Sequence, residues 1–315
     1  MNVQPNIILE RCEVKAFFVF SGQGAQHVGM GKDLYDAFPE ARRCFDATAR
    51  ELGKEHLEVI FEGPDDKLTS SRFCQTAIYT MSCAALEAFR ARKPEVVPVA
   101  CAGLSLGEYA ALYAAGAFDY VTGLKLLDRR AEAMDAACRK SSGGMASVLK
   151  ADPAVIEAAC AEAGIDVANY NSPGQIVISG EKTKLAKAIE ILRAKGVSRI
   201  IELNVAGAFH SRLMAEAGEA FAPALAAAKF EMPRVPVYHN FTAAAAKDLG
   251  ELRENLARQV SGSVRWEGCL RAAVAAGADT VIEFGPGNVL TGLAKRTLPE
   301  LRLVNINSAA ALENL

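Results

Sequence analysis

Hydrophobic and polar positions between residues 143 and 205 follow a pattern that predicts four short strands and two helices. Four short apolar runs predict strands, and two longer amphipathic stretches predict helices. In chain order these segments are 145–149, 153–162, 165–168, 175–179, 183–195 and 199–203. This strand–helix–strand–strand–helix–strand order is that of the ferredoxin-like arrangement, so we expect a ferredoxin-like subdomain over residues 143–205. Asn171–Gly174 would form the hairpin turn between its two middle strands.

On both sides of this segment, strand-like and helix-like stretches alternate, and the chain contains no tandem repeat or low-complexity block. Such alternation predicts the α/β class. We expect residues 1–142 and 206–315 to form one α/β-hydrolase-like large domain, into which the ferredoxin-like subdomain is inserted. With 315 residues and 51% hydrophobic content, the chain is long enough to bury a large core and a smaller second one.

The segment Val99–Leu112 joins an apolar, strand-like run to an Ala- and Leu-rich helical run through the sequence Gly-Leu-Ser-Leu-Gly. This is the pattern of a nucleophile elbow, in which the two glycines leave room for a sharp strand-to-helix turn. Ser105 would project its hydroxyl beside the N-terminus of the helix, where N–H groups and the helix dipole favour a developing oxyanion. Because chance gives only about 0.1 such matches in a chain of this length, Ser105 is our candidate nucleophile.

A serine nucleophile needs a base, and the chain has four histidines. His210 follows the apolar run Arg199–Asn204, at what should be a strand end or loop, the position from which open α/β sheets present catalytic groups. His239 lies in the sequence Val-Pro-Val-Tyr-His-Asn and is a second candidate. Spacing alone leaves the choice between these two histidines open.

Seven ordered motifs, together with Gln75, resemble those of the malonyl-CoA:acyl carrier protein transacylases. The motifs are Phe17–Gln26, Gly103–Glu108, Arg130–Met134, Asn169–Ile178, Gly207–Ser211, Val264–Trp266 and Glu283–Gly292. The resemblance extends from about Ala16 to Arg296 and covers nearly the whole chain. Within that family, the chain resembles a free-standing malonyltransferase of fatty acid synthesis or its close relative, the discrete acyltransferase that serves a polyketide synthase in trans.

The resemblance implies that Ser105 is the nucleophile and His210 its base. It also implies that the backbone N–H groups of Gln23 and Leu106 form the oxyanion hole. Physical reasoning agrees, because Gln23 lies between two glycines after the first strand and Leu106 directly follows the nucleophile. The group that orients the base would be a backbone carbonyl near Val264–Trp266, and we expect that of Arg265.

The substrate residues also come from the resemblance. Arg130 would bind the free carboxylate of a malonyl group, a task that suits guanidinium because it forms two parallel, charge-assisted hydrogen bonds to carboxylate. Phe209 and Leu106 are residue types associated with malonyl rather than methylmalonyl groups. Gln75 and Asn171 would contact the substrate as well.

One position departs from the family pattern. The residue before the nucleophile is Leu104, where the family usually has histidine. Since His210 occupies the base position, we expect activity to be retained. The absence of this imidazole would affect the rate and the acyl preference.

The reaction implied by this resemblance is a ping-pong transfer of a malonyl group from malonyl-CoA to the phosphopantetheine thiol of a holo acyl carrier protein, through an acyl-serine. Two other classes remain open. A serine hydrolase or thioesterase would share Ser105 and His210 and release the acid. A non-catalytic carrier-binding module would bind carrier protein without becoming acylated.

Composition narrows the partners and the compartment. A net charge of −2 indicates no nucleic-acid partner. The eight cysteines form no Cys-x-x-Cys pair, so we predict no metal site, and the resemblance implies no cofactor.

Free cysteines, together with the lack of a signal peptide or an apolar run long enough to span a membrane, point to the cytoplasm. The residues before Cys12 would form a loose N-terminal extension.

Overall fold

The computed structural model describes residues 14–315, which divide into two compact units. Unit 1 contains the described residues up to Asp128, Lys229–Tyr238 and Arg271–Leu315, whereas unit 2 contains Arg129–Ala228 and His239–Leu270. The predicted extension before Cys12 lies outside the described residues. Each unit is described by itself below.

Unit 1 is built on a parallel sheet of four strands in the order β2-β1-β7-β8. The strands are β1 (Ala16–Phe20), β2 (Pro98–Gly103), β7 (Thr280–Phe284) and β8 (Arg302–Ile306). Every residue of β1 and β7 is buried, which is the pattern of strands covered on both faces of a parallel sheet. The carboxyl ends of β1 and β2 are in register at Phe20 and Gly103, so the loops that follow these strands begin side by side.

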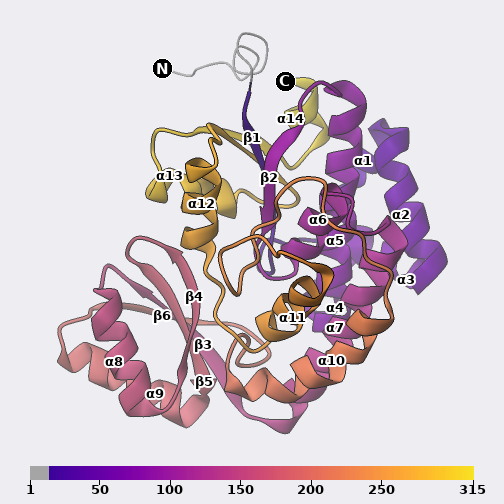
Figure 1. The fold of residues 1–315 in the computed structure, drawn as a ribbon. Helices are drawn as coiled ribbons and strands as arrows, with labels where there is room; N and C mark the ends of the chain where they lie inside the picture. The colour runs from indigo at the N-terminus through magenta and orange to yellow at the C-terminus, as the bar shows by residue number, and fades with distance from the viewer. Residues whose placement is uncertain (1–13) are drawn as a thin grey trace. The chain divides into compact units, whose positions relative to one another are not determined.

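Helices cover this sheet (Figure 1), with α6 packed against β1 and β2 and α5 packed against β7 and β8. Phe89 of α5 contacts Phe284 of β7 edge to face, at 5.2 Å between ring centroids. The helices of unit 1 are α1 (Lys32–Ala37), α2 (Pro39–Leu52), α3 (Lys54–Glu62), α4 (Asp65–Thr69), α5 (Ser71–Arg92), α6 (Gly107–Ala114), α13 (Val289–Thr297) and α14 (Ala309–Glu313). Two further helices, α7 (Tyr120–Lys140) and α12 (Trp266–Ala275), contain boundaries between the units.

Unit 2 contains an antiparallel sheet in the order β4-β5-β3-β6. Helices α8 (Pro153–Ala163) and α9 (Lys182–Ala194) lie on one face of it (Figure 1), and Ile156, Val148 and Leu185 are buried together between sheet and helices. The strands are β3 (Gly143–Leu149), β4 (Asp166–Ser172), β5 (Gln175–Glu181) and β6 (Arg199–Leu203). All six segments predicted from the hydrophobic pattern form the expected type of element, in the expected order.

The largest difference from the sequence prediction is at β4, which continues to Ser172 instead of ending at Ala168. Asn169, Asn171 and Ser172 have low strand propensity, so the sequence pattern does not show this extension. Pairing with β5 and a bridge from Asn169 to Val264 hold these polar residues in the strand. The predicted hairpin turn is present, and Gly174 has the positive φ of 71° that such a turn favours.

The remaining elements of unit 2 follow β6. They are a short 3-10 helix, η2 (Arg212–Met214), and the helices α10 (Ala215–Ala227) and α11 (Leu249–Gln259). Over residues 14–315, no helix is both long enough and apolar enough to cross a bilayer.

Candidate active site

Ser105 lies in the turn between β2 and α6 with a left-handed backbone, φ 54°. The two glycines of the motif are required by close backbone contacts. A Cβ on Gly103 would lie 2.0 Å from the carbonyl of Gly107, and a Cβ on Gly107 would lie 2.3 Å from the carbonyl oxygen of Phe20. The strand–turn–helix expected from the sequence is therefore present, and it holds Ser105 in the conformation typical of a nucleophile elbow.

The loop after β1 lies against this turn. The N–H of Leu104 donates to the carbonyl of Phe20 at 3.1 Å. A Cβ on Gly22 would lie 2.7 Å from the Leu104 carbonyl oxygen and 3.1 Å from Leu104 Cδ2, so the leucine that departs from the family pattern packs on this loop. Gln23 is half-buried in the same loop. The structure thus brings Gln23 and Ser105 into neighbouring loops of unit 1.

Two more predicted residues belong to unit 1. Leu106 is buried at the N-cap of α6, and its carbonyl accepts the backbone N–H of Tyr109 at 3.1 Å. Gln75 is fully buried on α5.

His210 belongs to unit 2 and is buried in the segment after β6, also with a left-handed backbone, φ 55°. Its Nδ1 lies 2.8 Å from the backbone carbonyl oxygen of Gln259. Since a carbonyl only accepts, Nδ1 carries the hydrogen of this bond, and the basic lone pair of the neutral ring is on Nε2. The side chain is therefore oriented as a general base requires.

The pKa of His210 is lowered from 6.5 to about 4. Burial is the largest cause and the nearby positive charge of Arg130 is the second, while hydrogen bonds to the backbone of Gln259 and Gly262 act in the opposite direction. The imidazole is consequently neutral at physiological pH.

Arg130 is 1% exposed on α7, and its Nη2 donates to Oε1 of Gln259 at 2.9 Å. A buried arginine is unusual, since charged side chains are almost never fully buried unless they are paired. Gln259 contacts Arg130 through its side chain and His210 through its backbone. The predicted carboxylate-binding residue and the predicted base are thus connected by one residue.

The carbonyl bonded to His210 differs from the one that we predicted. We expected the carbonyl of Arg265, but the carbonyl bonded to His210 is that of Gln259, whereas Arg265 is exposed and its Nε donates to the carbonyl of Phe241. The sequence did contain a signal for Gln259. Asn255 and Gln259 lie at helical spacing with Leu252 and Leu256 on the buried face of α11, and polar residues in an apolar stripe need partners.

Phe209 and Asn171 are both buried in unit 2. Phe209 directly precedes His210. Oδ1 of Asn171 is buried and has no hydrogen-bond partner among the described residues, which leaves an acceptor for a bound molecule.

The other three histidines are placed differently. His239 is buried in unit 2, and its backbone N–H donates to the Ala244 carbonyl at 3.0 Å. His56 packs on Phe73 at 4.6 Å between ring centroids, and His27 is exposed. We keep His210, whose ring is bonded to the Gln259 carbonyl, as the predicted base.

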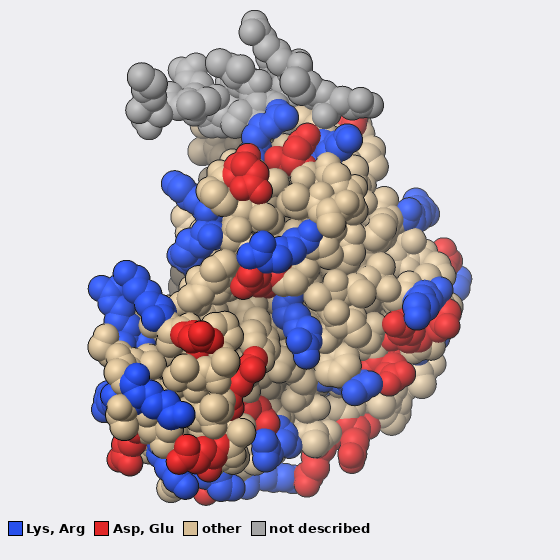
Figure 2. All heavy atoms as spheres, turned by 60° about the vertical axis from the view of Figure 1, so that its left-hand side comes forward, with Lys and Arg blue, Asp and Glu red and all other residues tan. Residues whose placement is uncertain are grey.

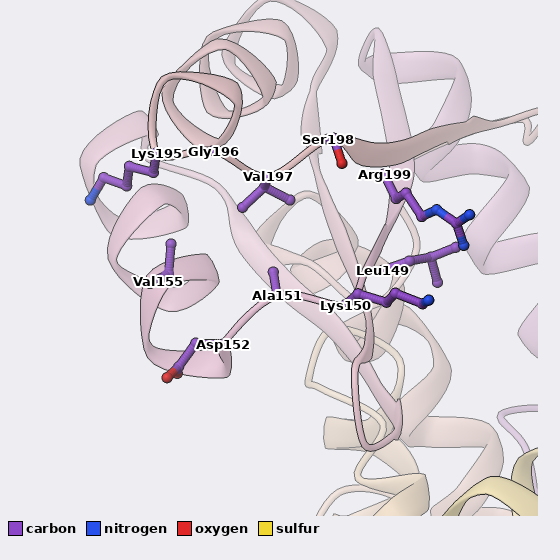
Figure 3. A pocket seen from close by; sticks show the side chains of 10 residues that line it. All are labelled: Leu149, Lys150, Ala151, Asp152, Val155, Lys195, Gly196, Val197, Ser198 and Arg199. Atoms are coloured by element: carbon purple, nitrogen blue, oxygen red, sulfur yellow. The ribbon is translucent and has the colours of Figure 1, made fainter.

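Two hollows lie wholly within unit 2. One, of about 450 Å³, is bordered by His210 and by residues of α8, β4 and the segment 261–265. The other, of about 310 Å³, lies between the end of β3 and the start of β6 and contains no predicted site residue (Figure 3). Lys150 and Arg199 extend in the same direction at its edge (Figure 3).

Residues 17–313 match the family described as the acyl transferase domain. The chain belongs to the acyl transferase domain family. Among relatives of this acyl transferase domain, a malonyl CoA-acyl carrier protein transacylase of Bacillus subtilis is 37% identical over 304 residues, covering 95% of this chain and 95% of the relative. A polyketide biosynthesis malonyl CoA-acyl carrier protein transacylase of the same organism is 39% identical, covering 89% of this chain and 96% of the relative.

Solved structures share the α/β fold of this acyl transferase domain. A malonyl-transacylase in complex with a type II polyketide synthase acyl-carrier protein is similar with a TM-score of 0.90 and 32% identity, covering 95% of this chain and 98% of that chain. The likeness thus extends over nearly the full length of both proteins.

Proposed function

We propose that this protein transfers a malonyl group from malonyl-CoA to the phosphopantetheine thiol of an acyl carrier protein, through an ester on Ser105. The observation that carries the proposal is the buried Arg130, connected through Gln259 to His210, in a chain whose relatives are named malonyl CoA-acyl carrier protein transacylases. A simple esterase has no need of a buried cation.

In the first half-reaction, Ser105 Oγ attacks the thioester carbonyl while His210 Nε2 accepts the hydroxyl proton. The N–H groups of Gln23 and Leu106 donate to the oxyanion that develops on the carbonyl oxygen. When the C–S bond breaks, the proton on His210 passes to the sulfur, and coenzyme A leaves as the thiol. The Gln259 carbonyl holds the imidazole in the tautomer that this transfer needs.

In the second half-reaction, the carrier thiol gives its proton to His210 and attacks the ester carbonyl. The C–O bond to Ser105 breaks, the serine oxygen recovers the proton, and malonyl-carrier is released. Arg130 binds the malonyl carboxylate in both halves through charge-assisted hydrogen bonds. Phe209, Gln75 and Asn171 contact the acyl-thioester chain.

Intact-mass measurement of the purified protein after mixing with malonyl-CoA tests this function. We expect a malonyl adduct on the wild-type protein that disappears when holo acyl carrier protein is added. Ser105→Ala should form no adduct and keep its thermal unfolding temperature, because only one half-buried hydroxyl is lost.

The outcomes separate the alternatives. Malonate release without transfer would indicate a serine hydrolase or thioesterase, and carrier binding without an adduct would indicate a non-catalytic module. A persistent adduct on Ser105→Ala would show that another side chain is the nucleophile. Repeating the measurement with methylmalonyl-CoA and acetyl-CoA tests the preference for malonyl groups.

The proposed partners are therefore malonyl-CoA and a carrier protein, without nucleic acid. Basic and acidic side chains are interspersed on the face shown in Figure 2, which agrees with a net charge of −2.

We propose the cytoplasm as the compartment, and this is supported by seven cysteines that form no disulfide within residues 14–315.

For the fold, we propose an α/β-hydrolase-like domain over residues 1–142 and 206–315 with a ferredoxin-like subdomain over residues 143–205. The order β4-β5-β3-β6 with two helices on one face supports the second assignment, and the elbow after β2 of a parallel sheet supports the first. These boundaries separate the two sheets, whereas the compact units divide the chain elsewhere.

A further inference from the structure

We infer that the ion pair between Arg212 and Asp166 is a positioning device for His210, which keeps the imidazole buried and bonded to its orienting carbonyl. The inference rests on the proposed role of His210 as the base. Both residues of the pair lie in unit 2, and both border the 450 Å³ hollow that His210 also borders.

The contacts of Arg212 differ from those of an ordinary surface ion pair. Its Nη2 donates to Asp166 Oδ1 at 2.6 Å, and its Nε donates to Oδ2 at 2.9 Å. Its backbone N–H donates to the same Oδ2 at 2.8 Å. The carboxylate therefore holds the main chain two residues after His210 as well as the guanidinium.

Asp166 is a rigid anchor for this purpose. It is the first residue of β4 and pairs in register with Ser179 of β5, so its backbone is fixed by the sheet. Arg212 begins η2, whose N-cap Ser211 donates its hydroxyl to the Ala208 carbonyl at 2.6 Å. The turn that contains His210 is consequently attached to the start of β4 through Arg212, two residues after the histidine.

The turn needs such an anchor because His210 has a left-handed backbone, a conformation that non-glycine residues rarely keep unless their surroundings enforce it. If Arg212 is released, the backbone can relax toward ordinary φ values. The imidazole then moves away from the Gln259 carbonyl and toward solvent.

The exposure of the pair separates a positioning role from a stabilising one. The side chains of Arg212 and Asp166 are 62% and 27% exposed. Solvent-exposed ion pairs contribute little to stability, so we expect the unfolding temperature to change little when this pair is removed. The burial and the pKa of the His210 ring should change instead.

Burial and nearby charges together set the pKa of His210. The charged and titratable groups near it in unit 2 are Arg130 on α7, Glu157 and Cys160 on α8, Asp166 and Tyr170 on β4, and Arg212 and Arg265. Burial is the largest influence on the His210 pKa and lowers it. Exposure of the ring should therefore raise the pKa from about 4 toward 6.5.

The test compares Arg212→Ala, Asp166→Ala and the double variant with wild type. We expect kcat for malonyl transfer to fall roughly 10-fold in Arg212→Ala, with KM for malonyl-CoA unchanged, because a misplaced base slows the chemical step. Asp166→Ala should lose at least as much, because it also removes the acceptor of the backbone N–H of residue 212, and the double variant should lose no more than Asp166→Ala. Arg212→Lys, which keeps the positive charge, should recover part of the rate lost in Arg212→Ala.

Two further measurements complete the test. The acid limb of the acylation rate should move to higher pH by about one pH unit in Arg212→Ala. Titration of the four histidines by nuclear magnetic resonance should show the same rise for His210 without any need for turnover. Lys184→Ala, which removes the exposed ion pair with Glu181 in the same unit, is the matched control and should change neither quantity.

Unchanged kcat and an unchanged His210 titration in Arg212→Ala would overturn the inference. A rate loss that follows a fall in unfolding temperature, with the titration unchanged, would also overturn it, because the pair would then only stabilise the fold. If the titration shifts as expected but His210→Ala is acylated as fast as wild type, the positioning role stands and the assignment of His210 as the base is wrong.

Discussion

Replacement of Arg130 by alanine tests whether this protein selects a dicarboxylic acyl group. Arg130 is 1% exposed, so its interaction with a bound carboxylate would be screened little by solvent. Truncation of one partner of a buried, hydrogen-bonded charge pair costs about 2–5 kcal/mol. Since about 1.4 kcal/mol corresponds to a factor of ten, malonyl transfer should fall by roughly 30-fold or more.

The structure also predicts two side effects of this substitution. The Gln259 side chain loses the hydrogen bond that Arg130 donates to its Oε1. The His210 pKa rises because the nearby positive charge of Arg130 is removed. If that pKa returned fully to 6.5, most of the imidazole would still be neutral at pH 7, and the rate would fall by less than about twofold. Acetyl transfer involves no free carboxylate, so its rate should stay within about twofold of the wild-type rate or increase.

The assay is the rate of acyl-enzyme formation from malonyl-CoA and from acetyl-CoA, measured for both proteins at the same pH. Arg130→Lys, which keeps the charge but loses the planar fork, should be intermediate for malonyl-CoA. Arg129→Ala removes the neighbouring exposed arginine, which pairs with Glu132, and serves as the control. Equal losses for malonyl-CoA and acetyl-CoA in Arg130→Ala would refute the reasoning, because Arg130 would then be structural.

Other expected outcomes concern the base and the main sheet. His210→Ala should slow acylation by several orders of magnitude, and a larger loss in His239→Ala would reverse the assignment of the base. Since protonation at a pKa of about 4 disables the base, the wild-type acylation rate should stay constant as pH falls to about 5 and then decline; a decline centred near 6.5 would contradict the lowered pKa. Glu283 is buried and accepts N–H bonds from Leu290 and Thr291 at the start of α13, so Glu283→Gln should lower the free energy of unfolding by about 1–3 kcal/mol, whereas exposed Glu254→Gln should not.

The sequence by itself predicted features whose causes are local. The elbow at Ser105 follows in part from Gly103, where a Cβ would clash with Gly107 in the same turn. Gly107 is required by the carbonyl of Phe20, a contact that the sequence pattern does not show. The six segments between 143 and 205 follow from apolar periodicity, which reports on backbone conformation and burial within each segment. The hairpin at Gly174 follows from a turn that favours positive φ.

Only the tertiary structure decided which distant residues meet. His210 bonds to a carbonyl 49 residues away, and Arg130 bonds to a side chain 129 residues away, both supplied by Gln259 at the end of α11. The pattern of side chains on α11 could mark Gln259 as a buried polar residue that needs a partner, but every residue has a carbonyl, so the pattern could not identify Gln259 as the acceptor for His210. β4 likewise continues to Ser172 through polar residues that pair with β5 and Val264 rather than through their own propensity. Local patterns specify elements, whereas the packing of those elements against each other specifies partners across the chain.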